Sequence, residues 1–283
     1  MRYTILLTYL VYCTEANENL LRVFGGRDAI DGEFPYVVPL VREKINESFC
    51  TGAVLTSTWT LTAGHCVASS NQKFILYETL VIAYKPSVKS ETAYSKILSI
   101  KVHPAYDAFM DNGLNDIAMV HTQPVLLTQY GKLSPVGYNT LYGQQITLVG
   151  YGAVNVTRFK VPILQVLDVI ARECQTDGVF DYPKICFAPR CSSHSDVLQS
   201  LCHGDSGGPA IHASGVIAVA SKLEKIRNTC DPIAKKQRSQ VITRFSVALS
   251  APTSAFVDWI SNLIKTELYR TIVTRLFKSE VKS

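Results

Sequence analysis

Short apolar runs, broken at close intervals by turn-forming residues, constrain the fold of this chain more than any other feature. Between about residues 23 and 250 the runs are rich in Val, Ile, Thr, Tyr and Leu, and Gly, Pro, Asn and Ser separate them. Examples lie at residues 36–41, 53–55, 145–149, 163–170 and 215–220. This spacing predicts an antiparallel barrel or sandwich rather than βαβ units.

The composition sets limits on the class of protein. With 283 residues, of which 47% are hydrophobic and 18% charged, the chain can bury a sizeable core and is not typical of disordered proteins. Its net charge of +5 is spread along the chain rather than gathered in one tract. A nucleic-acid partner is therefore not expected.

The first residues have the layout of a secretory signal peptide. Arg2 precedes an apolar run over residues 5–13, and small residues follow near residue 16. The run is too short to span a bilayer, although a buried N-terminal strand is an alternative interpretation. No later segment has 18 uninterrupted apolar residues, and two N-glycosylation sequons begin at Asn46 and Asn155. We therefore expect a signal peptide at 1–16 and a secreted, extracellular protein.

After Pro252 the apolar period changes to that of a helix. One helical face carries Phe256, Trp259, Ile260, Leu263 and Ile264. Farther along, a second apolar set falls on nearly the opposite face: Leu268, Tyr269, Ile272, Val273 and Leu276. Either the helix kinks near residues 265–267 or the extension packs on another surface. Its basic character leaves contact with a membrane or a partner open, but a solvated tail is the simpler interpretation.

Three short segments carry residues that together suggest a reaction. They are residues 61–66 with His65, residues 115–118 with Asp116, and residues 202–209 with Ser206. Alone, each has an ordinary explanation, such as a core histidine or a turn. Together they supply a hydroxyl, a base whose pKa lies near neutrality, and a carboxylate that can fix the imidazole tautomer.

In this order the three segments resemble the trypsin and chymotrypsin family of serine proteases, over about residues 22–264. The resemblance implies an all-β fold of two antiparallel six-stranded Greek-key β-barrels with a C-terminal α-helix. The first barrel would span 23–127 and the second 128–250, and residues 251–283 would form the helix and its extension.

The resemblance also assigns roles. Ser206 would be the nucleophile, His65 the general base and then acid, and Asp116 the carboxylate that orients the imidazole. The backbone N–H groups of Gly204 and Ser206 would form the oxyanion hole. No metal and no cofactor is expected, since the acidic calcium-binding loop of some relatives has no clear counterpart between residues 71 and 95.

The start of the family-like region looks like a zymogen activation site. Cleavage after Arg22 would remove a short propeptide at 17–22 and free the ammonium group of Val23. By the resemblance, that ammonium would pair with the carboxylate of Asp205, because an unpaired buried carboxylate is costly. The alternative is that Arg22 is an ordinary solvated residue.

Eight cysteines suit an oxidising compartment, although the number alone does not separate disulfides from metal ligands or free thiols. Cys13 would leave with the signal peptide. The resemblance implies three bridges, Cys50 with Cys66, Cys174 with Cys186, and Cys202 with Cys230. Cys191 is left as a free thiol, a link to a partner chain, or an alternative partner of Cys186 or Cys202.

The specificity pocket departs from the family pattern. Ser200 stands where trypsins carry an aspartate, so a preference for Lys or Arg is not expected. The usual Ser-Trp-Gly strand is aligned with Ala218, Val219 and Ala220, which would remove both a hydroxyl that contacts Asp116 and an aromatic wall. Gln240 would narrow the cavity further. We therefore expect a shallow pocket for small or medium apolar residues.

The sequence thus predicts a secreted serine endopeptidase, made as a zymogen, that works through an acyl-enzyme. Its partners would be protein or peptide substrates, an activating protease and protein inhibitors. The alternative is an inactive homologue that binds proteins, which the altered pocket favours and the intact catalytic segments oppose.

Overall fold

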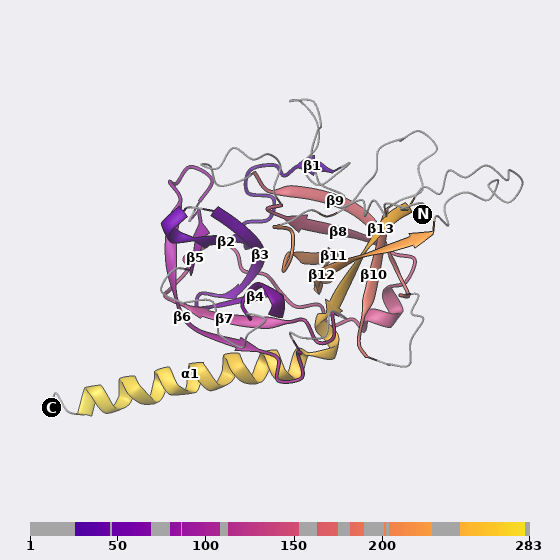
Figure 1. Cartoon of the computed structure of the whole chain (residues 1–283). Coiled ribbons are helices and arrows are strands. Elements are labelled where there is room, and N and C mark those ends of the chain that lie inside the picture. The colour runs from indigo at the N-terminus through magenta and orange to yellow at the C-terminus, as the bar shows by residue number, and fades with distance from the viewer. Residues whose placement is uncertain are drawn as a thin grey trace, which may run out of the picture.

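Two closed β-barrels lie side by side, and one long helix follows them at the end of the chain (Figure 1). The computed structural model describes residues 26–45, 47–68, 80–85, 87–107, 113–152, 163–174, 182–189, 201, 204–227 and 244–280. The predicted fold of two antiparallel six-stranded barrels with a C-terminal helix is confirmed. The proposed barrel limits at 23–127 and 128–250 stay predictions.

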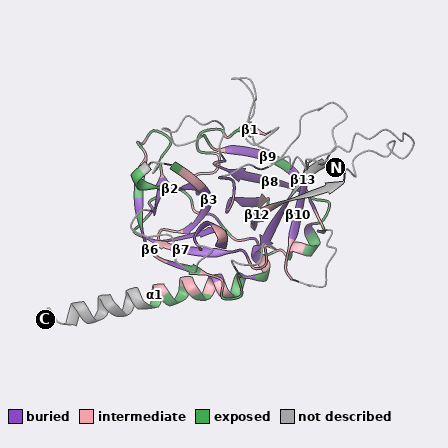
Figure 2. Cartoon of the chain, in the orientation of Figure 1, coloured by how far each residue is buried: buried purple, intermediate pink, exposed green. Residues whose placement is uncertain are grey.

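The first barrel is closed by six strands in the order β2-β3-β4-β7-β6-β5. In chain order they are β2 (Val37–Arg42), β3 (Glu47–Thr56), β4 (Trp59–Thr62), β5 (Leu80–Tyr84), β6 (Ala93–Val102) and β7 (Ala118–Thr122). Buried and more exposed residues alternate along much of β6, as expected for a strand with one face on the core. All four residues of β4 are buried (Figure 2).

The second barrel closes in the order β8-β9-β10-β13-β12-β11, because β8 pairs with both β9 and β11. Its strands are β8 (Gln145–Gly150), β9 (Gln165–Arg172), β10 (Ile185–Pro189), β11 (Pro209–His212), β12 (Gly215–Arg227) and β13 (Arg244–Pro252). The short strand β1 (Arg27–Asp28) precedes the first barrel in sequence but pairs with β9. The start of the described chain is therefore attached to the second barrel.

The apolar core of the first barrel continues into the junction between the barrels. One cluster joins first-barrel residues such as Leu40 and Leu61 to Val149 and Val219 of the second barrel. A separate cluster around Phe187 fills the second barrel. Loops that end at this junction are therefore supported from both sides.

The C-terminal helix α1 (Val257–Glu280) starts on the junction and extends past the barrels (Figure 1). Its buried side is anchored by Ile260, and the rings of His103 and Trp259 form a T-shaped pair with a centroid distance of 5.1 Å. The helix runs without interruption through residues 265–267 and is straight in Figure 1, so of the two alternatives the kink is not present. Leu268 and Tyr269 are 60% and 70% exposed, so this part of the second apolar face does not pack on a barrel.

No helix in the described part of the chain is long and apolar enough to cross a membrane.

Candidate active site

His65 and Asp116 come together because of the pairing of two first-barrel strands. His65 lies in the 3-10 turn η2 (Gly64–Cys66), just after β4, and Asp116 lies just before β7. In the antiparallel β4–β7 pair, Thr62 stands opposite Ala118. The residues that follow one strand and precede the other therefore meet at the same rim of the barrel.

Two hydrogen bonds join this pair. The Nδ1–H of His65 donates to Oδ2 of Asp116 at 2.7 Å, and the backbone N–H of His65 donates to Oδ1, also at 2.7 Å. An ionised carboxylate can only accept, so the ring proton is on Nδ1 and Nε2 is left as the basic nitrogen. The Asp116 side chain is 3% exposed and that of His65 is 36% exposed. The imidazole of His65 is therefore accessible to solvent, whereas the carboxylate of Asp116 that orients it is buried.

The carboxylate of Asp116 stays ionised although it is buried. Burial alone would raise its pKa, but the hydrogen bonds and charge interaction with His65, together with a hydrogen bond from Ser221, outweigh burial and hold the pKa below its usual value. The Ser221 hydroxyl donates to Oδ2 of Asp116 at 2.5 Å. Ser221 belongs to β12, so the second barrel also supports the charge.

This contact corrects the prediction that the strand lacks a hydroxyl for Asp116. The residues aligned with the Ser-Trp-Gly strand, Ala218, Val219 and Ala220, are buried between β11 and β13 and have no surface for a substrate. The hydroxyl comes instead from Ser221, the residue that follows them. In the β12–β13 ladder Ala220 pairs with Ser250 and Lys222 with Leu249, so Ser221 is the extra residue of a bulge. Bulges commonly redirect a side chain in this way.

Ser206 lies in a tight turn of the second barrel. Gly204 and Gly207 have φ angles of +100° and +80°, a region that favours glycine. A Cβ atom on Gly207 would collide with the Thr62 hydroxyl and the Thr51 carbonyl, so only glycine allows the turn to approach the first barrel. The turn is held by hydrogen bonds from Gly207 N–H to the Ala220 carbonyl at 2.8 Å and from Gly208 N–H to the Asp205 carbonyl at 2.9 Å.

The turn brings Ser206 next to the histidine loop. The Cys66 sulfur lies 3.6 Å from the Ser206 carbonyl oxygen and 3.8 Å from Nε2 of His65. The backbone N–H of Thr51 donates to the same Ser206 carbonyl at 2.8 Å. The structure therefore brings the Ser206 backbone against the loop that carries His65, at the junction of the two barrels.

Asp205 is buried beside the end of β8. The backbone N–H of Gly152 donates to its Oδ1 atom at 2.8 Å. A Cβ atom on either Gly150 or Gly152 would overlap this carboxylate. Because these two glycines have no side chain, the Asp205 carboxylate has room between them and the rest of its turn.

Two predicted disulfides are present, Cys50–Cys66 and Cys174–Cys186. The first joins β3 to η2 and so fixes the loop that carries His65. Although Cys50, Cys66 and His65 lie close enough to suggest a metal site, the two sulfurs are bonded to each other and offer no thiolate.

Several predicted positions lie outside the described residues. They are the segment 1–22 with Cys13 and Arg22, and also Val23, Asn46, Asn155, Cys191, Ser200, Cys202, Cys230 and Gln240. The third disulfide, both sequons and the floor of the specificity pocket therefore remain predictions.

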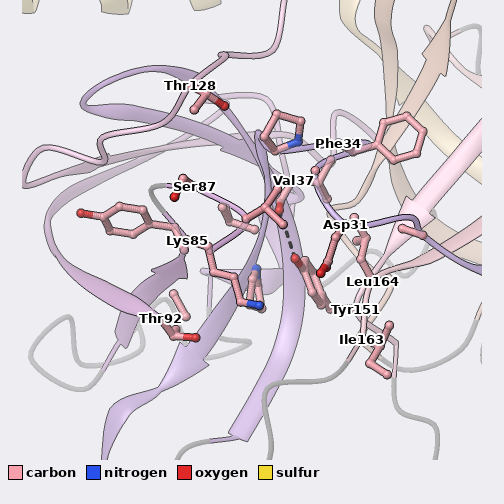
Figure 3. A pocket seen from close by; sticks show the side chains of 18 of the residues that line it. Asp31, Phe34, Val37, Lys85, Ser87, Thr92, Thr128, Tyr151, Ile163 and Leu164 are labelled. Atoms are coloured by element: carbon pink, nitrogen blue, oxygen red, sulfur yellow. Dashed lines mark hydrogen bonds between the residues drawn. The ribbon is translucent and has the colours of Figure 1, made fainter. Parts of the chain in front are cut away.

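A separate groove of about 660 Å³ lies near β2 and β5, and Figure 3 shows its lining. The lining is mainly apolar and includes Phe34 and Ile163, with Asp31 and Lys85 among its charged residues. None of the lining residues is His65, Asp116 or Ser206. The groove is thus a different place from the junction where these three residues lie.

Residues 23–251 match the family model described as Trypsin. The chain belongs to the trypsin family. It is 26% identical over 233 residues to serine protease SP24D of Anopheles gambiae, which covers 78% of this chain and 79% of that protein. It is 28% identical over 209 residues to Lectizyme of Glossina austeni, covering 67% and 71%.

A third relative is much longer than the match. The trypsin-family chain is 24% identical over 262 residues to the hepatocyte growth factor activator serine protease of Mus musculus, covering 86% of this chain and 37% of that protein. The family match and the serine protease relatives make this chain a serine endopeptidase.

Proposed function

We propose that this serine endopeptidase uses Ser206, His65 and Asp116 as its catalytic residues and is a secreted zymogen activated by cleavage after Arg22. The observation that carries the proposal is the contact of His65 Nδ1 with the buried carboxylate of Asp116 at 2.7 Å, with the Ser206 turn against the same histidine loop.

The residues would divide the chemistry as follows. Nε2 of His65 accepts the proton of the Ser206 hydroxyl while Oγ attacks the scissile carbonyl carbon. His65 then gives this proton to the leaving amine as the C–N bond breaks and an ester to Ser206 remains. Water hydrolyses the ester by the same proton route. Asp116, whose pKa is held low, stabilises the imidazolium in both steps.

The N–H groups of Gly204 and Ser206 would bind the oxyanion that forms at each attack. Loss of one such donor typically reduces the rate by about 10² to 10³. Both residues belong to the turn whose glycine φ angles and backbone hydrogen bonds are described above.

The position of β1 supports activation by the Val23 ammonium. Asp28 pairs with Gln165, and Gln165 pairs with Gly150, which lines the space around the Asp205 carboxylate. Neighbouring strands are about 4.8 Å apart, so Asp28 lies about 10 Å from this space. The stretch of chain from Val23 to Asp28 can span about 16 Å, which is enough to reach Asp205.

The substrate preference proposed is for small or medium apolar residues before the scissile bond. It rests on Ser200, because serine is uncharged and cannot neutralise a Lys or Arg side chain buried in the pocket. Profiling the cleaved protein on a peptide library tests this preference, and strong selection of Arg or Lys would contradict it. Protein substrates, an activating protease and protein inhibitors are the partners proposed.

A fluorophosphonate probe tests the catalytic assignment. We expect the protein cleaved after Arg22 to be labelled, and Ser206→Ala to abolish labelling, because the probe needs an activated serine. Ser214→Ala is the matched control. Its hydroxyl contacts Nδ1 of His212 at 2.8 Å but lies outside the proposed catalytic set, so this variant should label like the wild type.

Absence of labelling in folded, cleaved wild-type protein would contradict the proposal and favour a homologue that only binds proteins. Labelling that persists in Ser206→Ala would show that another serine reacts.

A further inference from the structure

We propose that the Thr51 hydroxyl is a positioning group for the oxyanion turn and acts by holding the carbonyl of Gly204. The inference rests on the proposed function, because it matters for catalysis only if the Gly204 N–H stabilises the oxyanion. Thr51 lies in β3 of the first barrel, next to Cys50, and is fully buried.

The side chain of Thr51 links two segments of the second barrel. Its Oγ1–H donates to the Gly204 carbonyl at 2.7 Å, and the same Oγ1 accepts the backbone N–H of Tyr151 at 2.8 Å. These partners are 153 and 100 residues away in the sequence. The hydroxyl thus uses its donor and an acceptor site together, which fixes its orientation.

The backbone of Thr51 holds the same region. Its N–H donates to the Ser206 carbonyl at 2.8 Å, and its carbonyl accepts the hydroxyl of Thr62 at 2.8 Å. The oxyanion turn is therefore attached to Thr51 at two carbonyls, one on each side of Asp205. A displacement of the turn that carried the Gly204 and Ser206 backbone with it would have to break at least one of these bonds.

The need for such an attachment follows from the conformation of Gly204. Glycine at a φ of +100° has no Cβ to limit its backbone, so several orientations of its peptide groups are accessible. Oxyanion stabilisation depends on a donor that is already aimed at the reacting atom. A buried hydroxyl from a barrel strand can select one orientation.

The other partner of the hydroxyl is itself well fixed. The phenol of Tyr151 is partly buried, and its hydroxyl donates to the Val37 carbonyl at 3.3 Å (Figure 3). The next residue, Gly152, donates its N–H to Asp205. Thr51 therefore ties the Gly204 carbonyl to the same short segment that holds the Asp205 carboxylate.

Variants at Thr51 can separate the hydroxyl from the shape of the side chain. Thr51→Val keeps the branched shape and removes the hydrogen bonds, whereas Thr51→Ser keeps the hydroxyl. Thr60→Val is the matched control: Thr60 is a buried threonine on β4, and its hydroxyl has no hydrogen-bond partner among the described residues.

The measurement is kcat and KM of the protein cleaved after Arg22 on a peptide substrate, with thermal unfolding to check folding. We expect Thr51→Val to lower kcat by about tenfold to a hundredfold, since a misplaced oxyanion donor weakens only the transition state. KM should change little. Thr51→Ser should recover most of kcat, and Thr60→Val should leave it unchanged.

A folded Thr51→Val variant with wild-type kcat would overturn the inference, and so would a Thr51→Ser variant as slow as Thr51→Val. If Thr51→Val does not fold, Thr51→Ala repeats the test without placing a methyl group against the Gly204 carbonyl. A wild-type protein that folds, is cleaved and shows no turnover would instead contradict the proposed function.

Discussion

The two halves of the candidate active site are held by different kinds of interaction. The charged half is the His65–Asp116 pair, which belongs to the first barrel and depends on hydrogen bonds to one buried carboxylate. The backbone half is the turn from Gly204 to Gly208, which belongs to the second barrel and depends on neutral hydrogen bonds and glycine conformations.

Each half is nevertheless anchored by a hydroxyl from the opposite barrel. Ser221 of the second barrel donates to the carboxylate of Asp116, and Thr51 of the first barrel donates to the carbonyl of Gly204. A shift of one barrel against the other would disturb both contacts at once. These two hydrogen bonds between the barrels therefore stabilise the junction, in addition to the apolar core.

The largest effect is expected for Asp116→Asn in the charged half. An amide at this position would favour the wrong imidazole tautomer and would not stabilise the imidazolium, so kcat should fall by about 10⁴. Steady-state kinetics on a peptide substrate measures this loss. Asp168→Asn is the control, because that carboxylate accepts the Thr147 hydroxyl on the exposed surface of the second barrel. If Asp116→Asn kept a kcat near that of the wild type, the charge of Asp116 would not matter for catalysis, and the division into a charged half and a backbone half would not hold.

A smaller effect is expected for Ser221→Ala, which removes the hydroxyl that the second barrel gives to the charged half. Hydrogen bonds to charged groups contribute about 1.5–3 kcal/mol, so the free energy of unfolding should fall by this amount. Urea denaturation measures it. Ser250→Ala is the matched control on β13, since the buried Ser250 hydroxyl has no partner among the described residues. Equal losses in the two variants would argue against a specific contribution from Ser221.

The sequence predicted the parts of the site that depend on residue type and order. Short apolar runs predicted the strands, and the order of His65, Asp116 and Ser206 predicted the family. The meeting of His65 with Asp116 depends on Thr62 standing opposite Ala118, a register that joins residues distant in the chain. Local patterns contain no information on such a pairing.

The two anchoring hydroxyls were missed for related reasons. Ser221 was missed because it lies in a bulge, one residue beyond the three that align with the family's Ser-Trp-Gly strand, although it is the sole serine of β12. Thr51 has the residue type of an ordinary β-strand position, and its partners are 100 or more residues away. The sequence signal that could have indicated Thr51 is its position in a mostly apolar strand, directly after Cys50.

The smallest effect expected is a difference in acid sensitivity between the halves. The pKa of Asp116 is lower in the folded protein than in the unfolded chain, where it is about 3.9, so the unfolded chain binds the proton more tightly. The stability that this carboxylate contributes is therefore present above about pH 4 and is lost as the pH falls through the folded-state pKa. Each tenfold difference in proton affinity between the two states corresponds to about 1.4 kcal/mol of this stability.

Urea denaturation between neutral and acidic pH measures this dependence. The free energy of unfolding of Asp116→Asn should change less with pH than that of the wild type, because the variant has no carboxylate to protonate at this position. Thr51→Val, which changes only neutral hydrogen bonds, should give a pH dependence parallel to that of the wild type. If Thr51→Val reduced the pH dependence as much as Asp116→Asn does, the two halves would be coupled through charge, and their separation into a charged half and a backbone half would not hold.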